Sequence, residues 1–66
     1  MYYMIEKINS AGYRVGNIDL VDPMPNIECG DFIQSFIARN NYHALQAIMY
    51  DQNGKIIATH STLDDT

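Results

Sequence analysis

The sequence predicts a small α+β domain in which one short helix packs on one face of a mostly antiparallel four-stranded sheet, in the order β-β-α-β-β. Three observations predict this class. Two segments rich in aromatic and β-branched residues open the chain. A stripe of apolar residues at helical spacing follows Asp31. Finally, Asn53-Gly54 separates two further apolar runs, which is the strongest short signal for a β-hairpin.

Residues 2–8 (YYMIEKI) predict the first strand and residues 13–21 (YRVGNIDLV) the second, joined by a turn at residues 9–12 into an antiparallel hairpin. Within the second segment, the apolar side chains move from one face of the strand to the other at Gly16-Asn17. A β-bulge produces a shift of this kind, and a glycine inside a strand often marks one. We therefore expect a bulge or a sharp bend at Gly16-Asn17.

Two prolines, Pro23 and Pro25, predict an irregular loop that runs from residue 22 to about Gly30. Asp31 then resembles a helix N-cap, with Gln34 as its capping-box partner. The helix should span about nine residues and end near residues 40–41. Its docking face should consist of four apolar residues at helical spacing, namely Phe32, Ile33, Phe36 and Ile37.

Residues 42–50 (YHALQAIMY) are compatible with a continued helix or with a strand. We favour the strand, because residues 51–54 (DQNG) then close a hairpin onto residues 55–61 (KIIATHS). This strand carries apolar residues on both faces, which is typical of a central strand. One short helix can cover only one face of the sheet, so we expect a second subunit to cover the other.

Residues 1–61 are expected to form a single domain, followed by a frayed acidic tail at residues 62–66. Eight Asp/Glu against four scattered Lys/Arg give a net charge of −4, which argues against direct binding of nucleic acid. No segment has the pattern of a signal peptide, and no apolar run approaches the ~20 residues of a membrane span. With a single cysteine, the chain is therefore expected to be cytoplasmic, with no membrane partner.

The supply of apolar side chains is large for so small an interior, because 47% of the 66 residues are apolar and five are tyrosines. Tyrosine is enriched at protein interfaces. Adjacent tyrosines on one strand point to opposite faces, so at least one of Tyr2 and Tyr3 should be exposed or covered by a partner. We predict a homodimer and a partner-binding face that includes four tyrosines: Tyr2, Tyr3, Tyr42 and Tyr50.

Acidic residues gather in the middle of the chain, where four carboxylates fall within thirteen residues with no intervening Lys or Arg: Asp19, Asp22, Glu28 and Asp31. In a compact loop they would form a docking site for a protein with a basic patch. Convergent carboxylates could also hold Ca²⁺ or Mg²⁺, but their spacing matches no fixed calcium loop, so we assign no metal site. A solvated acidic loop, with Asp31 acting only as a cap, is the third interpretation.

Cys29 lies beside the predicted helix start, where the pKa of a thiol can be lowered, and His43 or His60 could then act as its base. Glu28 and Asp31 flank the cysteine, however, and oppose formation of the thiolate. A domain of this size also leaves little room for a substrate pocket. We therefore predict no catalytic site and no cofactor, and we expect Cys29 to pack as a small apolar residue.

Residues 5–7 (IEK), 12–15 (GYRV), 19–20 (DL) and 29–31 (CGD) resemble the opening hairpin and helix of antitoxins of the HicB type. The resemblance covers about half of the chain. The chain departs from that family because it lacks the Pro-Asp-Leu-Pro-Gly-Cys run, has a longer loop, and shows no DNA-binding extension. The resemblance implies an antitoxin-like protein binder.

These features together predict a small non-catalytic protein–protein interaction module of the regulator or inhibitor type, acting through an apolar, tyrosine-rich face and an acidic loop. Two other classes stay open. One is a small enzyme or metal-dependent binder that uses Cys29 with His43 or His60, or the loop carboxylates. The other is a structural subunit of a larger assembly, joined through exposed strand edges.

Overall fold

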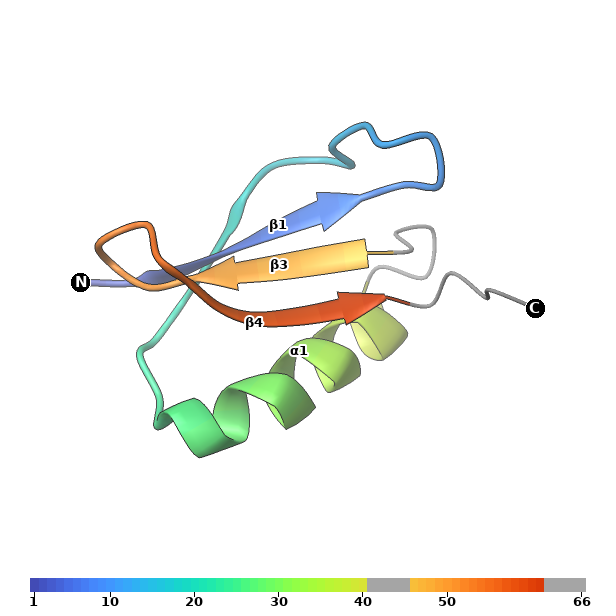
Figure 1. Ribbon diagram of the computed structural model, residues 1–66. Coiled ribbons are helices and arrows are strands. Elements are labelled where there is room, and N and C mark those ends of the chain that lie inside the picture. The colour runs from blue at the N-terminus through green and yellow to red at the C-terminus, as the bar shows by residue number, and fades with distance from the viewer. Residues whose placement is uncertain (41–45, 62–66) are drawn as a thin grey trace.

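The computed structural model describes residues 1–40 and 46–61, and these form a four-stranded antiparallel sheet with one helix on one side (Figure 1). In chain order the elements are β1 (Tyr3–Ile8), β2 (Asp19–Val21), α1 (Asn26–Asn40), β3 (Gln46–Tyr50) and β4 (Ile56–Ser61). The sheet order is β2-β1-β3-β4. The predicted α+β class and the order β-β-α-β-β are confirmed. Within the described residues, no helix is both long and apolar enough to cross a membrane.

The second strand is shorter than predicted, because only Asp19–Val21 pairs with β1 as a strand. The preceding chain meets β1 through an isolated bridge between Arg14 and Ile8, and through a backbone hydrogen bond from Val15 N–H to the carbonyl of Lys7. The predicted bend is confirmed at residues 16–17, where Gly16 has a φ of +70°. This left-handed conformation breaks the ladder and favours glycine.

Helix α1 begins at Asn26, so the predicted start at Asp31 and the predicted loop to Gly30 are wrong. The first turn forms directly after Pro25, whose carbonyl accepts a hydrogen bond of 2.9 Å from Glu28 N–H. A proline at this boundary costs nothing, since the first amides of a helix have no internal acceptor. Gly30 and Asp31 imitate a helix boundary, but both lie inside a helix of 15 residues.

The core lies between α1 and the sheet, and α1 packs on β3 and β4. Cys29 continues the buried stripe of the helix by one turn, because it lies four residues before Ile33. Phe32 and Phe36 are half-buried at the margin of the core, with ring centroids 6.2 Å apart. The predicted docking face is therefore confirmed and extended. The buried apolar residues are Ile5, Cys29, Ile33, Ile37, Ala47 and Met49.

The second hairpin has the predicted turn. Asp51 Oδ1 accepts hydrogen bonds from the backbone N–H groups of Asn53 and Lys55, at 2.8 and 2.9 Å, and Gly54 has a φ of +83°. Strand β3 lies in the interior of the sheet, as its two apolar faces predicted. The strand assignment is confirmed for residues 46–50, whereas residues 42–45 and the predicted tail at residues 62–66 lie outside the described residues.

Candidate functional site

The sheet face opposite α1 is a candidate binding surface. Residues directly across an antiparallel ladder share a face, and Met4 lies opposite both Leu20 and Tyr50. Leu20 is 61% exposed, Ile56 54% and the neighbouring Ile18 41%. We call this surface the open face, and it consists of Met4, Glu6, Ile18, Leu20, Ile48, Tyr50 and Ile56.

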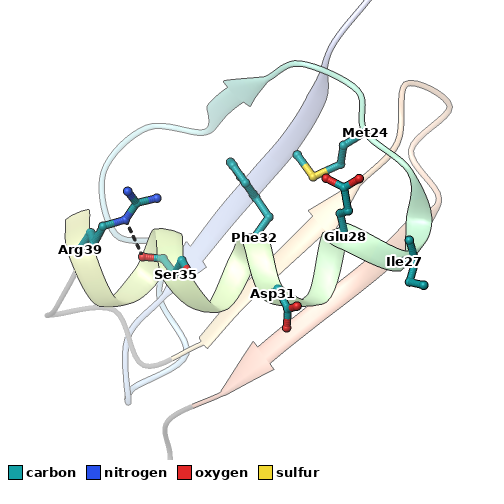
Figure 2. A pocket seen from close by; sticks show the side chains of 7 residues that line it. All are labelled: Met24, Ile27, Glu28, Asp31, Phe32, Ser35 and Arg39. Atoms are coloured by element: carbon teal, nitrogen blue, oxygen red, sulfur yellow. Dashed lines mark hydrogen bonds between the residues drawn. The ribbon is translucent and has the colours of Figure 1, made fainter.

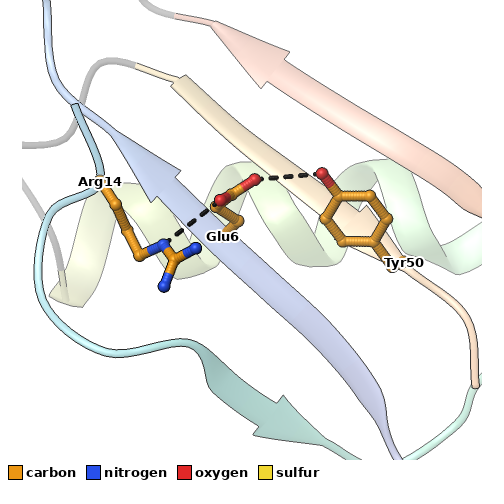
Figure 3. Close-up of polar contacts among 3 residues, drawn as sticks. All are labelled: Glu6, Arg14 and Tyr50. Atoms are coloured by element: carbon orange, nitrogen blue, oxygen red, sulfur yellow. Dashed lines mark hydrogen bonds and ion pairs between the residues drawn. The ribbon is translucent and has the colours of Figure 1, made fainter. Parts of the chain in front are cut away.

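A fixed polar group lies within the open face (Figure 3). The hydroxyl of Tyr50 donates a hydrogen bond of 3.0 Å to Glu6 Oε1, and Arg14 Nε donates to Glu6 Oε2 at 3.3 Å. Both carboxylate oxygens of Glu6 are therefore engaged. Partial burial, followed by the hydrogen bond and negative charge of Glu6, raises the pKa of Tyr50, while Arg14 opposes this effect. The arrangement holds the tyrosine ring and the arginine in defined positions.

Beside this group the open face is hollowed. A shallow depression of about 270 Å³ is lined by Met4, Glu6, Ile18, Tyr50 and Gly54. Its walls are mostly apolar, and its two polar side chains, Glu6 and Tyr50, are hydrogen-bonded to each other. The depression can therefore accept an apolar side chain of a partner around a polar anchor.

The structure separates the tyrosines that the sequence grouped together. Tyr50 lies on the open face, whereas Tyr3 packs against the core on the opposite side. Tyr2 and Tyr13 are exposed, so the expectation that at least one of Tyr2 and Tyr3 is exposed is confirmed. Tyr42 lies outside the described residues.

The structure also separates the predicted acidic residues. Asp19 forms an ion pair of 2.7 Å with Lys7, while Glu28 and Asp31 lie on the exposed side of α1. Asp22 is exposed in the short loop before the helix. Among residues 1–40 and 46–61, no three Asp, Glu, His or Cys side chains gather in a way that could hold a metal ion.

Cys29 is fully buried, and its thiol donates a hydrogen bond of 3.6 Å to the carbonyl of Pro25. Burial, followed by the charge of Glu28, raises the pKa of this thiol. His60 is half-buried on β4 opposite Ala47, and His43 lies outside the described residues. Cys29 is therefore placed as a core residue and not as an accessible nucleophile.

A second surface, which the sequence analysis missed, runs along α1 (Figure 2). It is a shallow groove of about 600 Å³, bordered by apolar, acidic and basic side chains. The misplaced helix start explains the omission, since it assigned Ile27 and Glu28 to a loop. The lining residues are Met24, Ile27, Glu28, Asp31, Phe32, Ser35 and Arg39.

Comparison with protein-family models finds no match, and comparisons with curated proteins and with solved structures find none either. The resemblance to antitoxins of the HicB type therefore stays a prediction.

Proposed function

We propose that this protein is a small non-catalytic protein-binding module of the regulator or inhibitor type, and that its partner docks on the open face. One observation carries the proposal. The helix covers one side of the sheet, and the other side presents exposed Ile18, Leu20 and Ile56 around a fixed tyrosine and arginine. Exposed apolar patches with polar rims are typical of protein interfaces, and Tyr and Arg are typical of their anchor residues.

The energetics of covering this face support the proposal. Full burial of an isoleucine or leucine side chain contributes about 1.5–3 kcal/mol, so the partly exposed members of the open face could each contribute roughly 1 kcal/mol. Covering Glu6 leaves no carboxylate oxygen without a partner, because Arg14 and Tyr50 already bond both oxygens. The Arg14 side chain is itself 55% exposed. A partner with apolar side chains and a carboxylate aimed at Arg14 fits best.

A capture experiment tests this assignment. The wild-type chain and the variants Leu20→Asp and Ile56→Asp are immobilised and exposed to a lysate of cells that encode the protein. Ala38→Asp is the matched control, because Ala38 is exposed on α1 and lies outside both the open face and the groove along the helix. We expect at least one protein to bind the wild type and Ala38→Asp but neither open-face variant, since a carboxylate there would be buried without a counter-charge.

Equal capture by all four chains, or capture by none, would argue against the proposal. Far-UV circular dichroism of each variant checks that it is folded.

We also propose a cytoplasmic location, because the single cysteine is a free thiol held in the core.

A further inference from the structure

We propose that α1 is the contact between two copies of this chain, which pair their helices in antiparallel fashion about a two-fold axis. The sequence placed the second subunit of a homodimer on the uncovered face of the sheet, whereas this inference places it on α1, so each copy would keep its open face available for a different partner. The inference depends on the order of charges along α1 and on the side chains between them.

A line of four residues runs along the flank of the helix, at the margin of its buried face, and it consists of Glu28, Phe32, Ser35 and Arg39. Spacings of four, three and four residues keep side chains on one stripe of an α-helix. Figure 2 shows Glu28, Phe32 and Arg39 projecting to the same side of α1. Phe32 is half-buried, and the other three are exposed.

This stripe is complementary to itself. The two-fold axis that places Arg39 of one copy opposite Glu28 of a second copy also places Ser35 opposite Phe32. Small serine beside large phenylalanine allows the helices to approach to the usual 8–10 Å. Asp31 lies about one turn from Glu28 and adds negative charge at the same end.

The charges on α1 favour an antiparallel pair of helices over a parallel pair. In a parallel pair, Glu28 would face Glu28 and Arg39 would face Arg39, which is repulsive at both ends. In the antiparallel pair, opposite charges meet at both ends of the contact. The two helix dipoles are also antiparallel, which places the positive end of each helix beside the negative end of the other. The Arg39 guanidinium is exposed, with Nε 3.4 Å from the carbonyl of Ser35, so it lies at the surface where the second copy would dock.

The solution mass, measured by light scattering during size-exclusion chromatography over a hundredfold concentration range, tests the pairing. We expect the wild type to approach twice its 7.5 kDa as concentration rises. Arg39→Glu and Glu28→Arg should each weaken the dimer at least tenfold, and the double variant Glu28→Arg/Arg39→Glu should regain most of the affinity. Lys55→Glu is the control for Arg39→Glu, since it makes the same charge change at an exposed site off the helix.

The double variant separates pairing from helix stability. Each single change places an unfavourable charge at an end of the helix, so the helix dipole alone predicts that the double variant is the least stable. Rescue of the dimer in the double variant therefore requires contact between copies. A monomer at all concentrations, a dimer unaffected by the single changes, or a double variant without rescue would each overturn the inference. A dimer lost in Leu20→Asp instead would assign self-association to the open face.

Discussion

The ammonium group of Lys7 lies 2.7 Å from Oδ2 of Asp19, although Lys7 is only 7% exposed. The pair joins β1 to β2, on the side of the sheet that faces α1. Gly16 lies over it, since a Cβ on Gly16 would come 3.5 Å from Lys7 Nζ. Apart from this ion pair, Asp19 Oδ2 has no hydrogen-bond partner among the described residues. Among the described residues Lys7 forms its ion pair with Asp19, so the ammonium depends on this carboxylate for its counter-charge.

The two partners should differ in what their loss costs. Asp19→Asn leaves a buried ammonium without a counter-charge and should lower the free energy of unfolding by about 2 kcal/mol. Lys7→Met keeps the apolar stem and leaves a carboxylate whose side chain is 38% exposed, so it should cost about 1 kcal/mol or less. Urea denaturation of both variants measures the difference. An equal loss in the two variants would contradict this account of the pair.

Gly30 should be replaceable with a gain in stability. It lies inside α1, has no positive φ, and a Cβ there would meet nothing within 4 Å. Gly30→Ala should therefore raise the free energy of unfolding by about 0.5–1 kcal/mol, because alanine loses less entropy in a helix. Gly54→Ala is the comparison, and its free energy of unfolding should be lower by about 1 kcal/mol, since Gly54 has a φ of +83°. Thermal denaturation should show opposite shifts in the midpoints of the two variants.

The hairpin of β3 and β4 was predictable because its signals are local. Asn53-Gly54 separates two apolar runs that pair over a short stretch of chain, with a register shift between Met49 and Tyr50. The pairing of β1 with β3 joins distant segments and has no such local signal. The helix start was not predictable in the same way. Gly30 and Asp31 carry the signature of a boundary, and only packing of Cys29 in the core shows that the helix continues through them.

The candidate surfaces were predictable only in part. A central strand with two apolar faces, set against a single helix, predicts one uncovered sheet face. The contact between Glu6 and Tyr50 could not be derived, because the two residues are far apart in sequence and meet through the register of β1 and β3. Likewise, Asp19 forms an ion pair with Lys7 and does not join the other acidic residues. This pairing follows from the fold and could not be derived from the positions of the two residues in the sequence.

Cys29 should be unreactive in the folded protein. Its side chain is fully buried and its raised pKa leaves less thiolate at neutral pH than a free cysteine would have. Ellman's reagent at about pH 8 should label it slowly in buffer and rapidly in denaturing urea. Cys29→Ala should retain partner capture and cost about 1 kcal/mol of stability. Native labelling as fast as in urea, or loss of capture by a folded Cys29→Ala variant, would assign this thiol a functional role.

Tyr50 should make stability depend on pH in the alkaline range. Its pKa in the folded protein is raised above the ordinary value of 10.0. The protonated phenol is therefore favoured by folding, so its contribution is fully present below about pH 10 and is lost as the pH rises through the folded-state pKa. Tyr50→Phe should remove this part of the pH dependence and should cost about 1 kcal/mol at neutral pH through the lost hydrogen bond.

The measurement is the thermal midpoint of wild type and variants at intervals between about pH 8 and pH 11. Glu6→Gln is the informative control. It keeps an acceptor for the Tyr50 hydroxyl but removes the negative charge that contributes to the raised pKa of Tyr50. The decrease of the thermal midpoint at alkaline pH should therefore be smaller in this variant than in the wild type, but still present. Midpoints of wild type and Tyr50→Phe that fall in parallel would show that the hydroxyl is not held by Glu6 in solution. Midpoints that converge as the pH rises would instead support the fixed tyrosine on which the open face depends.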